Sequence, residues 1–197
     1  MSGLPPVATI PIAELVLAYS EGRFPMCHND GELYWHDPDP RAIFPLADLR
    51  PNARALRAFR KAGFTHTRNE AFEAVIRACA DRDESWIDER IIATFVNMHS
   101  AGYAHSMETW QGGELVGGIY GVSLKGAFFG ESMFSRVPNA GKAAFFALVA
   151  HLQAKGHVLF DTQYINAFTQ QLGAIEVPRR AFRKQLELAL LVDALFL

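Results

Sequence analysis

Two polar side chains follow a strongly apolar run near residue 160. Val158-Leu159-Phe160 has the composition of a buried strand, and Asp161 and Gln163 come directly after it. In an extended backbone, residues two positions apart point to the same side, so we expect these two side chains on one face. A carboxylate beside an amide carbonyl can position an N–H donor. The pattern predicts a site that positions a proton donor; the alternative is that both residues cap a helix starting near Asn166.

A second acidic residue ends another apolar run. Glu131 follows the strand-like segment 127–130, and the next basic residue along the chain is Arg136. A carboxylate at the end of a strand is free to pair with an incoming cation. Glu131 could therefore bind a cationic group of a substrate or form an internal ion pair with Arg136 or with Arg41. The residues alone slightly favour the internal ion pair.

A run of positive charge lies between residues 49 and 69, which hold six basic residues and no acidic one. The segment 53–62 is rich in helix formers and is followed by Gly63, which predicts a helix that ends there. Basic residues spaced three or four apart form one stripe on such a helix. This stripe indicates contact with phosphates, with a solvated helix face as the alternative. Its members are Arg54, Arg57, Arg60 and Lys61.

The composition is that of an ordinary globular protein. The chain has 197 residues, of which half are hydrophobic, and its net charge of −2 does not by itself favour nucleic acid. It contains no apolar run long enough to cross a bilayer and no secretory signal, so we expect no membrane association and a cytoplasmic location. Cys27 and Cys79 match no metal or redox spacing, and His99, His105 and His151 match no metal-ligand spacing, so we expect no metal.

The hydrophobic pattern predicts an α+β fold. The small N-terminal unit, residues 1–45, holds one helix and a proline-rich loop, and the second domain, residues 46–197, begins with the basic helix. Two helices, three antiparallel strands, a helix, a strand and a last helix then follow. This order is typical of an acetyl-transferase-like domain of the GNAT or Fem type, with a mixed, mostly antiparallel sheet flanked by helices. The predicted helices are 12–21, 53–62, 70–80 (with Asn69 as N-cap), 88–100, 142–155 and 178 onwards; the strands are 104–110, 115–124, 127–130 and 158–163; the loop is 23–41.

Several segments resemble one family of enzymes, the leucyl/phenylalanyl-tRNA–protein transferases. The resemblance runs from about residue 12 to about residue 183. It implies an enzyme that moves Leu or Phe, and also Met, from aminoacyl-tRNA to the N-terminal Arg or Lys of an acceptor protein, which marks that protein for N-end-rule degradation. The matching segments are Gly130–Arg136, Glu114–Val122, Asp161–Gln163 with Asn166, Ile175–Arg180, Ala18-Tyr19, Gly22–Pro25 and Pro38–Ala42.

The resemblance also implies roles for individual residues. Gln163 would accept a hydrogen bond from the attacking amine, and Asp161 would orient its amide. Glu131 would meet the cationic side chain or amine of the acceptor, and Asn166 would bind the aminoacyl-adenosine. Trp86 would stack on the terminal adenine, while Met26 stands where the family pattern has an aromatic residue; Tyr19 and Trp35 are nearby alternatives. For Trp86 and for the apolar residues, a plain core role is the alternative. The pocket for the Leu or Phe side chain would be formed by Ile119, Phe128, Met133, Leu148 and Phe160.

Two other functions compete with this one. A small-molecule N-acyltransferase would use an acyl-CoA, but Asn139-Ala140-Gly141-Lys142 has too few glycines for a diphosphate loop. A non-catalytic RNA-binding module would use the basic stripe alone. We expect no cofactor, because aminoacyl-tRNA is itself a substrate, and we expect a monomer.

Overall fold

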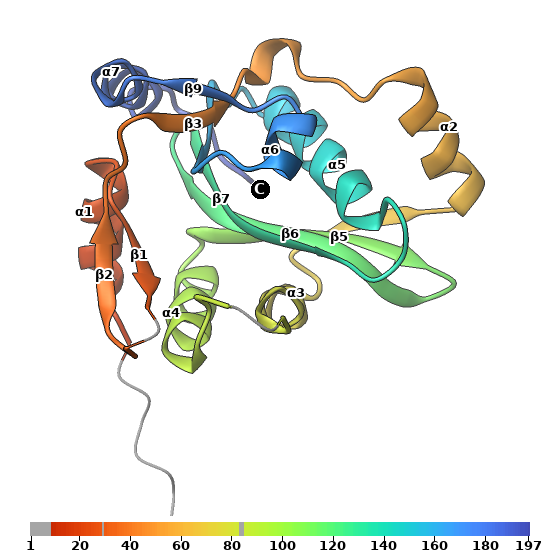
Figure 1. Cartoon of the computed structure of the whole chain (residues 1–197), viewed down its shortest axis with the longest axis horizontal. Helices are drawn as coiled ribbons and strands as arrows, with labels where there is room; N and C mark the ends of the chain where they lie inside the picture. The colour runs from red at the N-terminus through yellow and green to blue at the C-terminus, as the bar shows by residue number, and fades with distance from the viewer. Residues whose placement is uncertain (1–8, 29, 83–84) are drawn as a thin grey trace, which may run out of the picture.

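A mixed sheet of seven strands forms the centre of the molecule (Figure 1). The computed structural model describes residues 9–28, 30–82 and 85–197. The strand order is β4-β5-β6-β7-β8-β3-β9, and within it β7 and β8 are parallel while the other neighbours are antiparallel. A parallel pair needs a crossover connection, which α5 provides. The strands are β3 (Arg41–Phe44), β4 (Thr65–Arg68), β5 (Ala104–Gln111), β6 (Glu114–Leu124), β7 (Ala127–Ser135), β8 (Leu159–Gln163) and β9 (Ile175–Val177).

Helices cover both faces of this sheet. Helices α3 and α4 pack on one face, where Phe95 lies against Tyr120, and α5 packs on the other, where Phe145 stacks on Phe160 (Figure 1). In the described residues, no helix is long and apolar enough to span a membrane. The helices are α1 (Ile12–Ser20), η1 (Leu46–Asp48), α2 (Ala53–Ala62), α3 (Phe72–Ala80), α4 (Glu89–Ser100), α5 (Ala140–Ala154), α6 (Ala167–Gln171) and α7 (Arg179–Ala189).

The α+β class and the mostly antiparallel sheet are confirmed, and the predicted elements occur in the predicted order. Strands β4 and β9 and helix α6 lie between them and were not part of that order. Helix α2 has the predicted bounds, and Gly63 ends it in the left-handed conformation with φ 66°. Two local predictions are wrong. Helix α3 begins after Ala71, and Asn69 does not cap it; its side-chain oxygen instead accepts the backbone N–H of Ser106 at 3.0 Å. Strand β7 continues to Ser135, because its second half stays paired with β6.

The N-terminal segment folds as helix α1 followed by a hairpin, β1 (Phe24–Cys27) and β2 (Leu33–His36). The prediction of an irregular loop over 23–41 is therefore wrong. Pro25 is tolerated because a two-stranded sheet leaves one edge of each strand unpaired, so the missing N–H costs no ladder bond. The hairpin stands at one end of the central sheet (Figure 1). The proposed division at residue 45 assigns β3 to the N-terminal unit, whereas β3 pairs with β8 and β9 in the large sheet.

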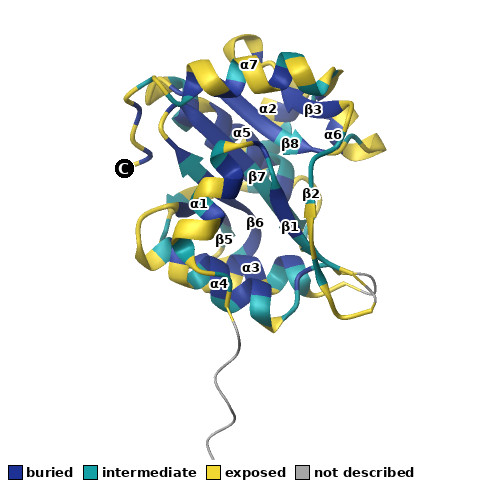
Figure 2. Ribbon diagram, turned by 90° about the vertical axis from the view of Figure 1, so that its left-hand side faces the viewer, coloured by how far each residue is buried: buried dark blue, intermediate teal, exposed yellow. Residues whose placement is uncertain are grey.

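Burial changes along the strands next to the hairpin. The first three residues of β7 are buried, while residues 130–134 are half-buried, and β2 carries exposed residues (Figure 2). Strand β8 is buried along most of its length. The second half of β7 is therefore open to solvent on a side where a polar side chain can meet a substrate.

Candidate active site

A pocket of about 350 Å³ lies between the hairpin, the segment after α3, the middle of β7 and the last residues of β8. Eight of the predicted site residues line it: Met26, Trp86, Ile119, Glu131, Met133, Phe160, Gln163 and Asn166. Nine lining residues were not predicted: Phe24, Phe44, Arg82, Gly130, Ser132, Thr162, Tyr164, Phe168 and Thr169. Several of these are immediate neighbours of predicted residues, which is the signal that could have found them.

Four predicted residues lie behind the pocket wall instead of on it. Phe128 and Leu148 are buried in the core on the α5 side, where Phe128 makes an edge contact with Phe160. They support the wall and do not form its surface, because Phe128 of β7 and Leu148 of α5 both pack into the core between the sheet and α5. Tyr19 and Asp161 are fully buried, and each contacts a neighbouring polar residue.

Asp161 forms a buried ion pair with Arg41. Its two carboxylate oxygens accept Nε–H and Nη2–H of the guanidinium at 2.8 and 2.6 Å, and both side chains are fully buried. Arg41 also donates to the carbonyl oxygen of Gly22 at 2.8 Å. Its guanidinium carbon lies 4.8 Å from the ring centre of Phe24 and 4.4 Å from that of Phe182. The pair thus joins the turn after α1, β1, β3, β8 and α7 at one point.

Gln163 does not continue the extended strand. Its φ of 60° is left-handed, and its backbone N–H donates to Asp161 Oδ1 at 3.1 Å. The expected bond between the Asp161 carboxylate and the Gln163 amide is not formed, because Arg41 occupies that carboxylate. The two side chains therefore do not act as a pair on one face. Within the described residues, the buried Gln163 Nε2 has no hydrogen-bond partner.

The alternative role for this pair, capping the next helix, is also excluded. Asn166 caps α6: its side-chain oxygen accepts the backbone N–H groups of Phe168 and Thr169, each at 2.9 Å. Gln163 is thus free of a structural role at the helix. A buried N–H group without a partner is costly in a folded protein, and in the part of the chain that the structure describes Gln163 Nε2 is such a group in the pocket wall.

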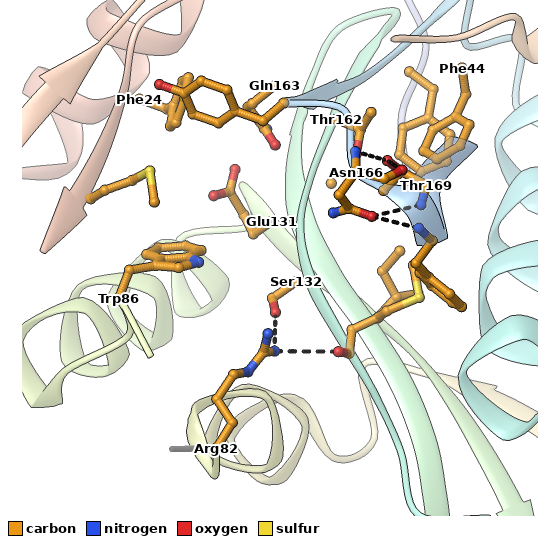
Figure 3. A pocket seen from close by; sticks show the side chains of 17 residues that line it. Phe24, Phe44, Arg82, Trp86, Glu131, Ser132, Thr162, Gln163, Asn166 and Thr169 are labelled. Carbon is orange, nitrogen blue, oxygen red and sulfur yellow. Dashed lines mark hydrogen bonds between the residues drawn. The ribbon is translucent and has the colours of Figure 1, made fainter. Parts of the chain in front are cut away.

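Glu131 faces the pocket from β7, and Figure 3 shows its carboxyl group and the amide of Gln163 turned to the same space. Its Oε1 accepts the hydroxyl of Tyr19 at 2.7 Å. Among the described residues it forms no ion pair with Arg41 or Arg136, the two partners considered from the sequence. Burial, strengthened by the negative charge of Asp161, raises the pKa of Glu131 from 4.5 to about 8. The empty site therefore holds this carboxyl mostly protonated near pH 7.

The two predicted adenine walls lie together. Met26 of β1 and the half-buried Trp86 both line the pocket, so Trp86 is not simply a core residue. Figure 3 shows the ring of Trp86 across the pocket from Gln163. Trp35 lies outside this pocket, on β2, with 38% of its surface exposed.

The basic stripe is on the other side of the molecule from the hairpin. Arg54, Arg57, Arg60 and Lys61 are exposed on α2, and in the described part of the chain none of them forms an ion pair. Helix α2 lies beyond α5 as seen from the hairpin (Figure 1), and it contacts α5 through Phe59 and Phe146. The charge is thus separated from the pocket by the width of α5.

The remaining candidates for chemistry have structural partners. His99 and His151 each bond to a backbone carbonyl oxygen, and His105 bonds to Asn69. Cys27 and Cys79 are free thiols, and burial raises the pKa of Cys79 to about 12. Over residues 9–28, 30–82 and 85–197, no three His, Cys, Asp or Glu side chains are grouped so as to hold a metal ion.

Comparison with known proteins places the chain. The family model described as leucyl/phenylalanyl-tRNA protein transferase matches residues 43–187, and the model of that family's N-terminal domain matches residues 9–39. A leucyl/phenylalanyl-tRNA–protein transferase of Gloeobacter violaceus is 49% identical, with 92% of this chain and 95% of that protein covered. One of Salinibacter ruber is 50% identical, with 89% of this chain and 78% of that protein covered.

Solved structures give a weaker likeness. A conserved protein from Bacteroides thetaiotaomicron has a TM-score of 0.48 at 11% identity, covering 77% of this chain and 56% of that one. The L-PGS structure from Bacillus licheniformis has a TM-score of 0.45 at 14% identity, covering 76% and 56%. The sequence matches, which extend over both the hairpin and the central sheet, carry the assignment: the chain belongs to the leucyl/phenylalanyl-tRNA–protein transferase family, a family of aminoacyltransferases.

Proposed function

We propose that the pocket binds the aminoacyl-adenosine end of Leu-tRNA or Phe-tRNA and that the N-terminal Arg or Lys of an acceptor protein attacks the ester there. The observation that carries this proposal is Gln163 Nε2, which has no hydrogen-bond partner among the described residues and lies with Glu131 beside an apolar chamber and an aromatic wall. The product is an acceptor protein extended by one residue, which enters N-end-rule degradation in the cytoplasm. Neither a cofactor nor a second copy of the chain is required by this scheme.

The reaction is aminolysis of an ester. The α-amine of the acceptor forms a bond to the carbonyl carbon, the bond from that carbon to the ribose oxygen breaks, and a proton passes from the amine to this leaving oxygen. Because an α-amine has a pKa of about 7.7–8.0, a useful fraction is already neutral near pH 7. The site therefore needs to align the amine more than to deprotonate it.

Gln163 performs this alignment in our proposal. Its amide oxygen accepts a hydrogen bond from the attacking amine, and its Nε2–H, which lacks a partner in the described residues, donates to the substrate. Asp161 is a positioning residue: it holds the backbone N–H of Gln163, while Arg41 fixes the carboxylate. The ion pair thus sets where the amide stands without touching the substrate.

Glu131 binds the cationic acceptor. A nearby Arg or Lys side chain stabilises the ionised carboxylate and lowers its pKa, so the acceptor's arrival releases a proton from Glu131 near pH 7. The hydroxyl of Tyr19 keeps the carboxyl group in place. An acceptor with a neutral N-terminal side chain would leave Glu131 protonated, so its contact with Glu131 would contribute much less binding free energy.

The apolar chamber takes the side chain of the transferred amino acid. Ile119, Met133, Phe44 and Phe160 supply its walls. A flexible thioether and aromatic rings adapt to several shapes, so the chamber accepts Leu, Phe and Met. Such walls separate similar chains by only about 1–3 kcal/mol per methylene.

The acceptor stem of the tRNA lies on α2, where the basic stripe contacts phosphates. Such contacts release counterions, so binding weakens as salt rises. We expect Arg54→Ala, Arg57→Ala and Arg60→Ala together to flatten the dependence of KM on salt and to leave kcat unchanged.

The decisive experiment is transfer of labelled Phe from Phe-tRNA to peptides that begin with Arg, Lys, Ala or Glu. We expect products with Arg and Lys, and a large loss in Gln163→Ala with the protein still folded. No transfer by the wild type would end the proposal. Thermal protection by acetyl-CoA and none by Phe-tRNA would instead favour an acyl-CoA enzyme, and activity loss confined to the α2 variants would favour an RNA-binding module.

A further inference from the structure

One cation in the pocket wall is not used by the reaction described above. Arg82 follows α3 and lines the pocket on the side opposite the Glu131 carboxyl group. Of the described lining residues, it alone carries a positive charge. Its Nε–H donates to the carbonyl oxygen of Cys79 and its Nη2–H to Ser132 Oγ, both at 2.8 Å. The guanidinium is therefore held in one place by neutral acceptors, and among the described residues it forms no ion pair.

The pocket has a linear arrangement. Figure 3 shows Glu131 and Gln163 at one end, Arg82 and Ser132 at the other, and Trp86 on the wall between them. An aminoacyl-adenosine has the matching order: the ester on the 3′ side of the ribose, the base beside it, and the 5′ phosphate on the far side from the ester. Placing the ester at Gln163 and the base on Trp86 directs the phosphate to Arg82.

We propose that Arg82 binds the 5′ phosphate of the terminal adenosine of the aminoacyl-tRNA. This proposal rests on the proposed function, since it assigns the second end of the same substrate. A guanidinium suits a phosphate because its planar N–H groups match two phosphate oxygens, and the contact is charge-assisted. Arg82 then fixes how far the nucleotide enters the pocket, while α2 holds the stem elsewhere.

The test uses two small substrates that differ only in that phosphate. These are 3′-O-phenylalanyl-adenosine and 3′-O-phenylalanyl-adenosine 5′-monophosphate, with a peptide beginning with Arg as acceptor. For the wild type we expect kcat/KM to be roughly tenfold higher with the phosphate, the size of one charge-assisted contact at a partly exposed site. In Arg82→Gln we expect the ratio of the two kcat/KM values to fall to about one, and in Arg82→Lys we expect an intermediate ratio.

Arg77→Ala is the matched control. Arg77 lies on α3 with an exposed side chain paired to Glu73 and Glu89, outside the pocket, so its removal leaves the tenfold difference intact. A wild type that uses both substrates equally overturns the proposal. So does an Arg82→Gln variant that weakens both equally, because Arg82 would then only tie the α3 end to β7.

A measurement on the unaltered protein covers the case in which the variants do not fold. Adenosine and adenosine 5′-monophosphate are titrated as inhibitors of Phe transfer from Phe-tRNA. Stronger inhibition by the monophosphate supports the phosphate site, and equal inhibition overturns it. Absence of any transfer from Phe-tRNA contradicts the proposed function instead, so the two failures are distinguishable.

Discussion

The neighbouring strands β7 and β8 each carry one carboxylate beside the pocket, and the two groups have opposite surroundings. Asp161 is fully buried and fully compensated, with a bidentate guanidinium on its oxygens. Glu131 is half-buried and has one neutral donor, the Tyr19 hydroxyl. The first carboxylate is therefore part of the scaffold, and the second is left for a substrate. The presence of an acidic residue on a strand does not by itself distinguish these two roles. They are distinguished by the group that each carboxylate contacts, which is Arg41 for Asp161 and Tyr19 for Glu131.

The sharpest way to test this contrast is to remove the compensated carboxylate. Asp161→Ala leaves Arg41 buried without a counter-charge, so we expect the free energy of unfolding to fall by about 3–5 kcal/mol. Denaturant unfolding measures it. Glu131→Ala leaves no buried charge without a partner, so we expect a much smaller loss in the free energy of unfolding. A double change, Arg41→Leu with Asp161→Leu, removes both charges and should recover part of the loss. Equal costs for the two single variants would contradict the contrast.

At Gln163, the last residue of β8, the contribution of the backbone turn can be measured separately from that of the side-chain amide. Gln163→Ala and Gln163→Gly both remove the amide, and we expect each to lower the rate of Phe transfer by about 10–100-fold, the effect of one or two hydrogen bonds. Because the φ of 60° suits glycine, Gln163→Gly should be as stable as the wild type or more so. Transfer kinetics and thermal unfolding are measured together. Full activity in Gln163→Gly would mean that the backbone turn, not the amide, matters.

The uncompensated carboxylate predicts a pH-dependent stability. Between pH 4.5 and about 8 the folded protein keeps a proton on Glu131 that the unfolded chain has released, so this group lowers stability as pH rises through that window. Glu131→Gln removes the effect and keeps an acceptor for Tyr19. At pH 8 we expect this variant to be more stable by about 1–2 kcal/mol, allowing for the solvent that reaches a half-buried group.

The check is thermal unfolding of both proteins from pH 5 to pH 9. The gain in Glu131→Gln should shrink toward pH 5, where the carboxyl is protonated in both states. Tyr19→Phe serves as the control, since it removes the hydroxyl that favours the ionised form and should steepen the slope. A constant difference at all pH values would show that Glu131 is ionised throughout.

These contrasts explain what could be predicted from the sequence. The order of elements, helix α2 and its end at Gly63 follow from local patterns. Of the eight predicted residues that line the pocket, Glu131 and Gln163 stand out as polar residues after apolar runs, whereas the other six were predicted only from the family resemblance. The Arg41–Asp161 pair joins positions 120 residues apart, so no local sequence pattern predicts it. The left-handed φ of Gln163 cannot be predicted from the residue type, because glutamine has no preference for that conformation. The hairpin was not predicted because Pro25 lies in its first strand, and a proline usually argues against a strand.

Asn166 gives the smallest expected effect and tests whether the residues after β8 also divide into scaffold and substrate contact. It caps α6 through two backbone N–H groups and also lines the pocket. Removing an N-cap costs about 1 kcal/mol, so Asn166→Ala should lower stability by that amount, whereas Asn166→Asp keeps the cap. If the residue is scaffold only, Asn166→Asp transfers Phe as the wild type does. A rate loss in Asn166→Asp at unchanged stability would place its amide N–H groups on the substrate, because the carboxylate keeps the acceptor oxygen and loses only those donors.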